Sequence, residues 1–185
     1  MPQLADWIHW YGATLEGTPL NHVVRSLGGL DGEELRRRLA GLWLAMEPRA
    51  NLPQPASWKT IAPSLYRNED LRIRRDAERL AAVFGDASMF PRLRSTLADR
   101  RAPAADRKHA FAVLGRAQDA ATLPVFLELL DDDAFRTPAI GIVGRFNAPG
   151  VAPALLVCLA AGAAAQTPAR MSTTDPDGTL VLHAV

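Results

Sequence analysis

The sequence predicts an all-α fold in which helical hairpins stack into an α-solenoid behind an N-terminal helical cap. The first observation is a repeat in three stretches that begin at Arg74, Arg107 and Arg136. Alanine, aspartate, proline and leucine recur after 33 residues (107 − 74), and alanine, proline and leucine recur again after 29 (136 − 107). An offset shared by several residue types indicates a duplicated unit, and units of this length stack side by side. The second observation is composition, because aromatic residues are only 6% of a chain rich in alanine and leucine.

Three helices are expected in the cap, residues 1–47, over about 2–15, 19–27 and 31–46. The first should bury the stripe Leu4, Ile8, Tyr11 and Leu15, which recurs at helical spacing. Nearby aromatic residues, such as Trp7 and Trp10, should fill a core or plug the end of the stack.

Residues 48–56 hold three prolines, which predicts a stiff, extended connector at the main internal boundary. Residues 57–161 should then form the repeats. The expected helix pairs are 58–67 with 70–84, 87–98 with 104–117, and 120–130 with 133–146, followed by an unpaired helix at about 150–161. Residues 162–185 lose the helical periodicity and should form an irregular or disordered tail.

Composition limits the possible functions. The net charge is +1, so no global field attracts nucleic acid or acidic lipid. The single Cys158 excludes an internal disulfide and a cysteine-rich metal site. The histidines stand alone, without a second ligand at helical spacing. We expect no metal, no cofactor and no membrane span in this chain. We also expect no signal peptide, since no basic segment precedes an apolar one.

The repeats share a local pattern: a proline early in the first helix, an acidic turn, an arginine that opens the second helix, and an alanine three residues later. This pattern resembles the short form of the HEAT repeat over residues 57–161. A narrower resemblance rests on Ser57-Trp58, on the segment 71–86 and on the segment 127–136. These are similar to the HEAT segment of large bacterial multi-domain c-type cytochrome or membrane-bound dehydrogenase-like proteins.

That resemblance implies a fragment or truncated relative that serves as a spacer or docking module in an electron-transfer protein. Haem would then belong to a neighbouring domain outside this chain, and the compartment would be the periplasm or cell envelope. Without that relationship, the expected compartment is the cytoplasm. The partner would be another protein or the neighbouring domains of a larger polypeptide.

The resulting expectation is a non-enzymatic HEAT-repeat scaffold with no catalytic residue. Its second helices should offer an extended surface, on which Arg75, Arg79, Lys108 and Arg145 are the candidate partner-binding residues. The repeated arginines Arg74, Arg107 and Arg136 are interpreted differently. They should bind the carbonyls and carboxylates of the preceding turn and connect one unit to the next.

Two alternatives remain open. Residues 67–116 carry twelve cations and seven anions, an excess of +5 (12 − 7), which raises the possibility of a HEAT-like DNA-binding or DNA-repair protein. Few aromatic residues lie among these cations, and most of the cations alternate with acids, which disfavours nucleic acid. The other alternative is an enzyme resembling bilin lyases, which would need a pocket with a convergent acid or base.

Overall fold

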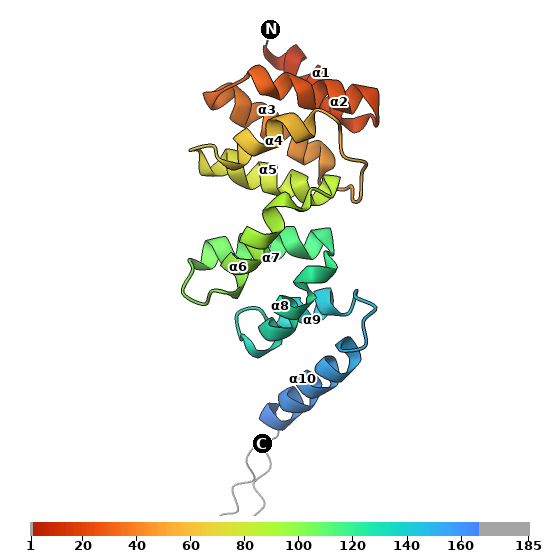
Figure 1. Ribbon diagram of the computed structural model, residues 1–185, viewed down its shortest axis with the longest axis vertical. Helices are drawn as coiled ribbons and strands as arrows, with labels where there is room; N and C mark the ends of the chain where they lie inside the picture. Colours follow the sequence, from red (N-terminus) through yellow and green to blue (C-terminus); the bar gives the residue numbers. More distant parts are fainter. Residues whose placement is uncertain (1, 167–185) are drawn as a thin grey trace, which may run out of the picture. The chain divides into compact units, whose positions relative to one another are not determined.

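The computed structural model describes residues 2–166, except for the side chains of residues 2–6, 8 and 161–166. Every regular element in this part of the chain is a helix (Figure 1), so the all-α prediction is confirmed. The chain divides into two compact units, Met1–Phe146 and Asn147–Val185. We call them the N-terminal and C-terminal units and describe each by itself.

The cap consists of α1 (Pro2–Thr14), α2 (Thr18–Ser26) and α3 (Gly32–Met46). Helix α1 contacts both α2 and α3. The predicted buried stripe of α1 is wrong, because Tyr11 and Leu15 are 49% and 40% exposed. His9 and Ala13 are buried instead. A β-carbon on Gly12 would lie 2.8 Å from Val23 Cγ2, so small residues, which permit close approach, select the packed face of α1.

The aromatic residues of α1 do not fill a core either. Trp7 and Trp10 are 60% and 40% exposed. The ring of Trp7 stacks on that of Tyr11 with centroids 5.6 Å apart. Leu4 and Ile8, the other two members of the predicted stripe, lie outside the described side chains.

Three hairpins follow the connector, at the positions the repeats predict. They are α4 (Trp58–Tyr66) with α5 (Leu71–Phe84), α6 (Phe90–Ala98) with α7 (Ala104–Ala117), and α8 (Leu123–Glu128) with α9 (Arg136–Val143). Short 3-10 turns occupy Leu27–Gly29, Ala87–Met89, Ala120–Thr122 and Leu129–Asp131. Helix α5 is capped at its C-terminus by Gly85, whose φ of 64° is a left-handed conformation that favours glycine.

The helices of the N-terminal unit contact one another in a regular order. Helix α3 contacts α1 and α5, and α5 contacts α7. On the other side, α2 contacts α4, and α6 contacts α8. Figure 1 shows these helices one below the next.

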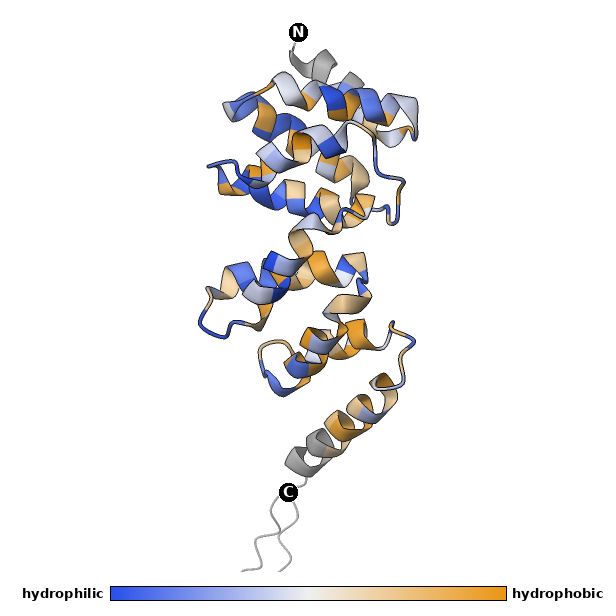
Figure 2. Cartoon of the chain, viewed as in Figure 1, coloured by the Kyte–Doolittle hydropathy of each residue, from blue (hydrophilic) through white to orange (hydrophobic). Residues whose placement is uncertain are grey.

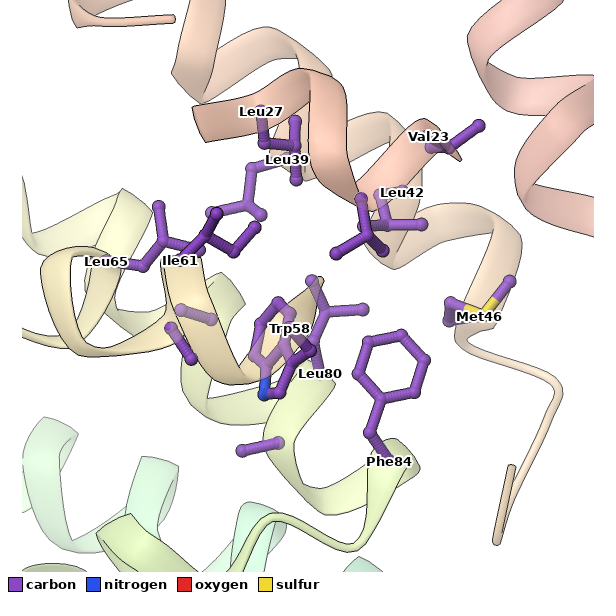
Figure 3. Packing of buried hydrophobic residues seen from close by; sticks show 14 of the residues in the cluster. Val23, Leu27, Leu39, Leu42, Met46, Trp58, Ile61, Leu65, Leu80 and Phe84 are labelled. Atoms are coloured by element: carbon purple, nitrogen blue, oxygen red, sulfur yellow. The ribbon is translucent and has the colours of Figure 1, made fainter. Parts of the chain in front are cut away.

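An apolar cluster with residues from α1 to α5 surrounds Trp58, which is fully buried (Figure 3). The Trp58 ring packs edge-on against Phe84, with centroids 5.2 Å apart. A smaller aromatic group joins the last hairpins. The ring centroid of Phe111 lies 5.6 Å from that of Phe126 and 5.4 Å from that of Phe135. In Figure 2 the turn between α6 and α7 is hydrophilic, whereas hydrophobic and hydrophilic residues alternate along the helices.

The C-terminal unit contains α10 (Val151–Gln166), which has no charged residue. The helix continues through Gly162, so the predicted start of an irregular tail at residue 162 is wrong. Alanine fills most of the segment after Gly162, and its high helix propensity explains the continuation. The remainder of the predicted tail, 167–185, lies outside the described residues.

Candidate interaction surface

The outward sides of α3, α5 and α7 form the candidate interaction surface. Arg75 and Arg79 lie one helical turn apart on α5, and Lys108 is exposed on the neighbouring α7. The fourth candidate, Arg145, is exposed but follows the end of α9 in a turn. The structure therefore brings three of the four residues onto two adjacent helices and leaves Arg145 apart from them.

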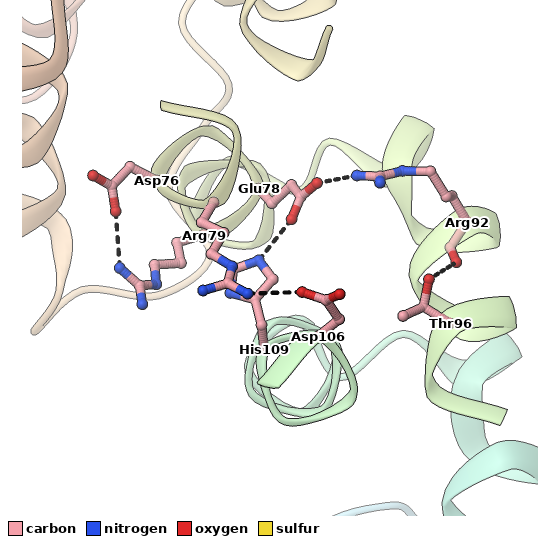
Figure 4. A network of polar contacts seen from close by, with 8 residues as sticks. Asp76, Glu78, Arg79, Arg92, Thr96, Asp106 and His109 are labelled. Carbon is pink, nitrogen blue, oxygen red and sulfur yellow. Dashed lines mark hydrogen bonds and ion pairs between the residues drawn. The ribbon is translucent and has the colours of Figure 1, made fainter. Parts of the chain in front are cut away.

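Two of these candidates already have internal partners. Arg75 Nη2 lies 2.7 Å from Asp106 Oδ1 on α7. Arg79 Nη1 lies 2.8 Å from Asp76 Oδ1, one turn earlier on α5 (Figure 4). Burial raises the pKa of the Asp76 carboxyl, and the charge of Arg79 opposes that rise. These pairs hold the two guanidinium groups in place while their outer edges remain accessible.

Trp43 joins three helices at this surface. Its ring lies 5.5 Å from Arg79 Cζ on α5 and 5.2 Å from Arg116 Cζ on α7. Cations at this distance from an indole ring are attracted to its π face. Arg116 also donates to the carbonyl of Glu47, at the end of α3. The arrangement fixes α3, α5 and α7 relative to one another and places two cations beside an aromatic ring.

Sequence reasoning did not identify Trp43 or Arg116 as parts of a surface. A signal did exist, since Trp43 follows the inward Leu42 and lies off the buried stripe of α3. The sequence does not show that α5 contacts both α3 and α7. These contacts bring the side chains of Trp43, Arg79 and Arg116 together.

The repeated arginines bind the preceding turn, as predicted. Arg74 Nη1 donates to the carbonyl of Glu69 at 3.0 Å, Arg107 Nε to that of Leu97 at 3.1 Å, and Arg136 Nε to that of Leu130 at 2.8 Å. Arg107 reaches further, since its Nη2 lies 2.7 Å from Asp132 Oδ2 in the following hairpin. These hydrogen bonds give the three arginines a structural role.

A buried polar network lies behind this surface, between α5, α6 and α7 (Figure 4). Glu78 is 4% exposed, and its Oε2 lies 2.6 Å from His109 Nε2. Its Oε1 pairs with Arg92. A cavity of about 160 Å³ adjoins the network and is also lined by Thr96 and Asp106. Because both carboxylate oxygens are engaged and the cavity is small, the network serves to connect the helices.

Among the described residues, no three histidine, cysteine, aspartate or glutamate side chains gather as metal ligands. No helix within residues 2–166 is long and apolar enough to cross a membrane. The chain matches no family model, no curated protein and no solved structure.

Proposed function

We propose that this chain is a non-catalytic scaffold: an α-solenoid of HEAT-like hairpins that binds a protein across the outward sides of α3, α5 and α7. The observation that carries the proposal is the cross-linking of successive helices by side chains at that surface. Trp43 joins α3 to α5 and α7 through Arg79 and Arg116. Arg75 and Asp106 join α5 to α7 again. A surface held together across several helices presents a fixed shape, which suits recognition by complementarity.

The charge of this surface indicates the chemistry of the partner. Arg79 and Arg116 flank an aromatic ring, and Lys108 is exposed on the same helix as Arg116. Tryptophan and arginine are the residues most often found at the energetic centre of protein interfaces. We propose that the partner offers acidic residues around an apolar group, which would match these side chains in charge and in shape.

The resemblance to c-type cytochrome proteins makes a neighbouring redox domain the first partner to test. In that case the scaffold holds its haem-bearing neighbour in position and contributes no electron carrier of its own. A haem-attachment motif in the adjoining reading frame would support this narrower proposal. An adjoining frame without such a motif would leave the scaffold function standing and remove the electron-transfer role.

The scaffold proposal is tested by site-specific photo-crosslinking in the organism of origin. A photoreactive residue at position 108 should capture one defined partner, and Arg79→Glu should abolish that capture because it reverses a charge at the centre of the surface. The same probe at position 25, which is exposed on α2, is the matched control. Identical products from both positions would contradict the proposal. Salt-sensitive binding of duplex DNA that Arg79→Glu abolishes would favour the nucleic-acid alternative instead.

A further inference from the structure

A second site lies between α4 and α6, where the structure has a cavity of about 590 Å³. This volume is within the usual range for small-molecule sites, roughly 300–1,000 Å³. The turn Ala87–Met89 and part of the connector complete its walls. The cavity lies wholly in the N-terminal unit and is separate from the surface of α3, α5 and α7.

One face of α4 lines this cavity. Lys59, Ala62, Pro63, Tyr66 and Arg67 all contribute to it. They follow the spacing i, i+3, i+4, i+7 and i+8, which places them on a single stripe of a helix. The middle of the stripe is largely apolar, and a cation stands at each end. Ala62 and Tyr66 in the middle of the stripe are buried, whereas Pro63 is exposed, so the stripe meets the cavity chiefly through Pro63 and its two cations.

The floor of the cavity holds a carboxylate whose hydrogen-bonding needs are already met. Asp86 Oδ2 accepts from Trp58 Nε1 at 3.0 Å and from the Tyr66 hydroxyl at 2.6 Å, and Oδ1 accepts from the Ser88 N–H at 3.1 Å. Burial acts to raise the pKa of Asp86, but the hydrogen bonds from Tyr66, Ser88 and Trp58 outweigh it, and the pKa is lowered. The Asp86 carboxylate at the floor of the cavity therefore remains ionised, and its hydrogen-bond donors are all neutral.

In the next hairpin the equivalent aspartate forms an ion pair. Asp119 lies 33 residues after Asp86 (119 − 86), and Arg94 Nη1 lies 2.7 Å from its Oδ2. At that junction, the charge of Arg94 on α6 is therefore neutralised within the protein. At the α4 junction Lys59 and Arg67 are both exposed, and within the described residues neither forms an ion pair with Asp86. These two cations remain accessible to a ligand.

We propose that this cavity binds a small amphipathic carboxylate. Its apolar body would lie against Pro63 and Met89, and its carboxylate would be held at the rim by Lys59 or Arg67, the cations at the two ends of the stripe. Arg92 also lines the cavity but is paired with Glu78, so it adds less charge. The hydrogen-bonded Asp86 closes the floor and repels an anion there, which directs the carboxylate to the rim and the apolar end inward.

Octanoate is a suitable probe, compared by titration calorimetry with 1-octanol and octylamine, which share its chain. We expect octanoate to bind saturably at one site and 1-octanol to bind about fivefold more weakly, because the alcohol lacks the charge that the rim attracts. Replacing both rim cations, Lys59→Gln with Arg67→Gln, should weaken octanoate by about tenfold and leave 1-octanol unchanged. The control pair Arg25→Gln with Arg101→Gln, at exposed positions outside the cavity, should bind octanoate like the unaltered chain.

Binding must also be located, because other apolar surfaces attract such molecules. The indole N–H of Trp58 donates to Asp86, so its NMR resonance should shift as octanoate fills the cavity. Ser88→Trp, which places a bulky ring in the cavity, should abolish that shift, whereas Ser95→Trp on the exposed side of α6 should not. Equal affinity for 1-octanol, an unaffected double variant or an unmoved Trp58 resonance would each overturn the proposal. None of these results would bear on the α3, α5 and α7 surface.

Discussion

The Trp58 core and the last two hairpins solve the same packing problem with different chemistry. Around Trp58, buried leucines, Phe84 and Met46 fill the space between α3, α4 and α5. The last hairpin has helices of only six and eight residues, which present less apolar surface. There a buried ion pair is added: Arg107 is 7% exposed and binds both Leu97 O and Asp132. The comparison teaches that a buried arginine ion pair supplements the smaller apolar contact of the short last hairpin.

The largest expected effects come from variants that disrupt the two cores one at a time. Trp58→Ala should cost about 3–5 kcal/mol, since it removes a fully buried ring, and Phe126→Ala should cost a similar amount. If hairpins contact only their neighbours, Phe126→Ala should raise hydrogen exchange mainly in α7, α8 and α9, and Trp58→Ala mainly in α3, α4 and α5. Uniform acceleration of exchange across the N-terminal unit by either variant would show that the helices unfold as one block.

The ion pair of the last hairpins should produce a smaller effect with a defined pH dependence. Arg107→Met should cost about 2–3 kcal/mol at neutral pH, because it leaves Asp132 without its cation. The hydrogen bond from Arg107 lowers the pKa of Asp132 from its ordinary 3.8. A carboxyl with a lowered folded pKa contributes stability above that ordinary value and loses it as the pH falls through the folded pKa.

Denaturant unfolding of the unaltered chain and of Arg107→Met, from neutral pH to below pH 3.8, would measure how the cost of the substitution depends on pH. The destabilisation by Arg107→Met should shrink as the pH falls, since protonated Asp132 no longer needs the cation. Arg136→Met is the matched control: its partner Asp133 is 89% exposed, so a cost below about 1 kcal/mol is expected. A cost for Arg107→Met that stays constant with pH would mean that packing, and not charge, dominates at this position.

Much of the helix order was predictable, because the repeat of residue types determines where each hairpin begins. The structural role of Arg74, Arg107 and Arg136 was predictable for the same reason, as each follows a turn whose carbonyls lie within its reach. The packed face of α1 was not, since the apolar stripe through Tyr11 competes with the closer approach that Gly12 permits.

The side chains that meet at and behind the candidate surface could not be predicted from the sequence either. Periodicity shows that Glu78 falls among inward positions of α5, but it does not show that His109 and Arg92 meet it from two other helices. The stack of Arg79, Trp43 and Arg116 depends in the same way on which helices are neighbours. Contacts inside one helix can be read from spacing, whereas contacts between helices require the order of the stack.

The smallest expected effect compares one glycine from each region. Gly41 lies within α3, and an added β-carbon there would meet nothing within 4 Å. Gly41→Ala should therefore stabilise the chain by about 0.5–1 kcal/mol through helix propensity. Gly115 lies within α7, and its added β-carbon would lie 2.2 Å from Ile142 Cδ1. Because that atom ends a flexible side chain, Gly115→Ala should be close to neutral, the gain in propensity offsetting a forced shift of Ile142.

Thermal melting of the two single variants would measure this pair, and Gly115→Ala with Ile142→Val supplies the control. Shortening the isoleucine removes the atom nearest to the new methyl group, so Ile142→Val should cost less in the Gly115→Ala background than alone. Equal stabilisation by Gly41→Ala and Gly115→Ala would show that the contact between α7 and α9 is loose. A loss of several kcal/mol from Gly115→Ala would show the opposite, that α9 is held against α7 as tightly as the helices around Trp58 are held together.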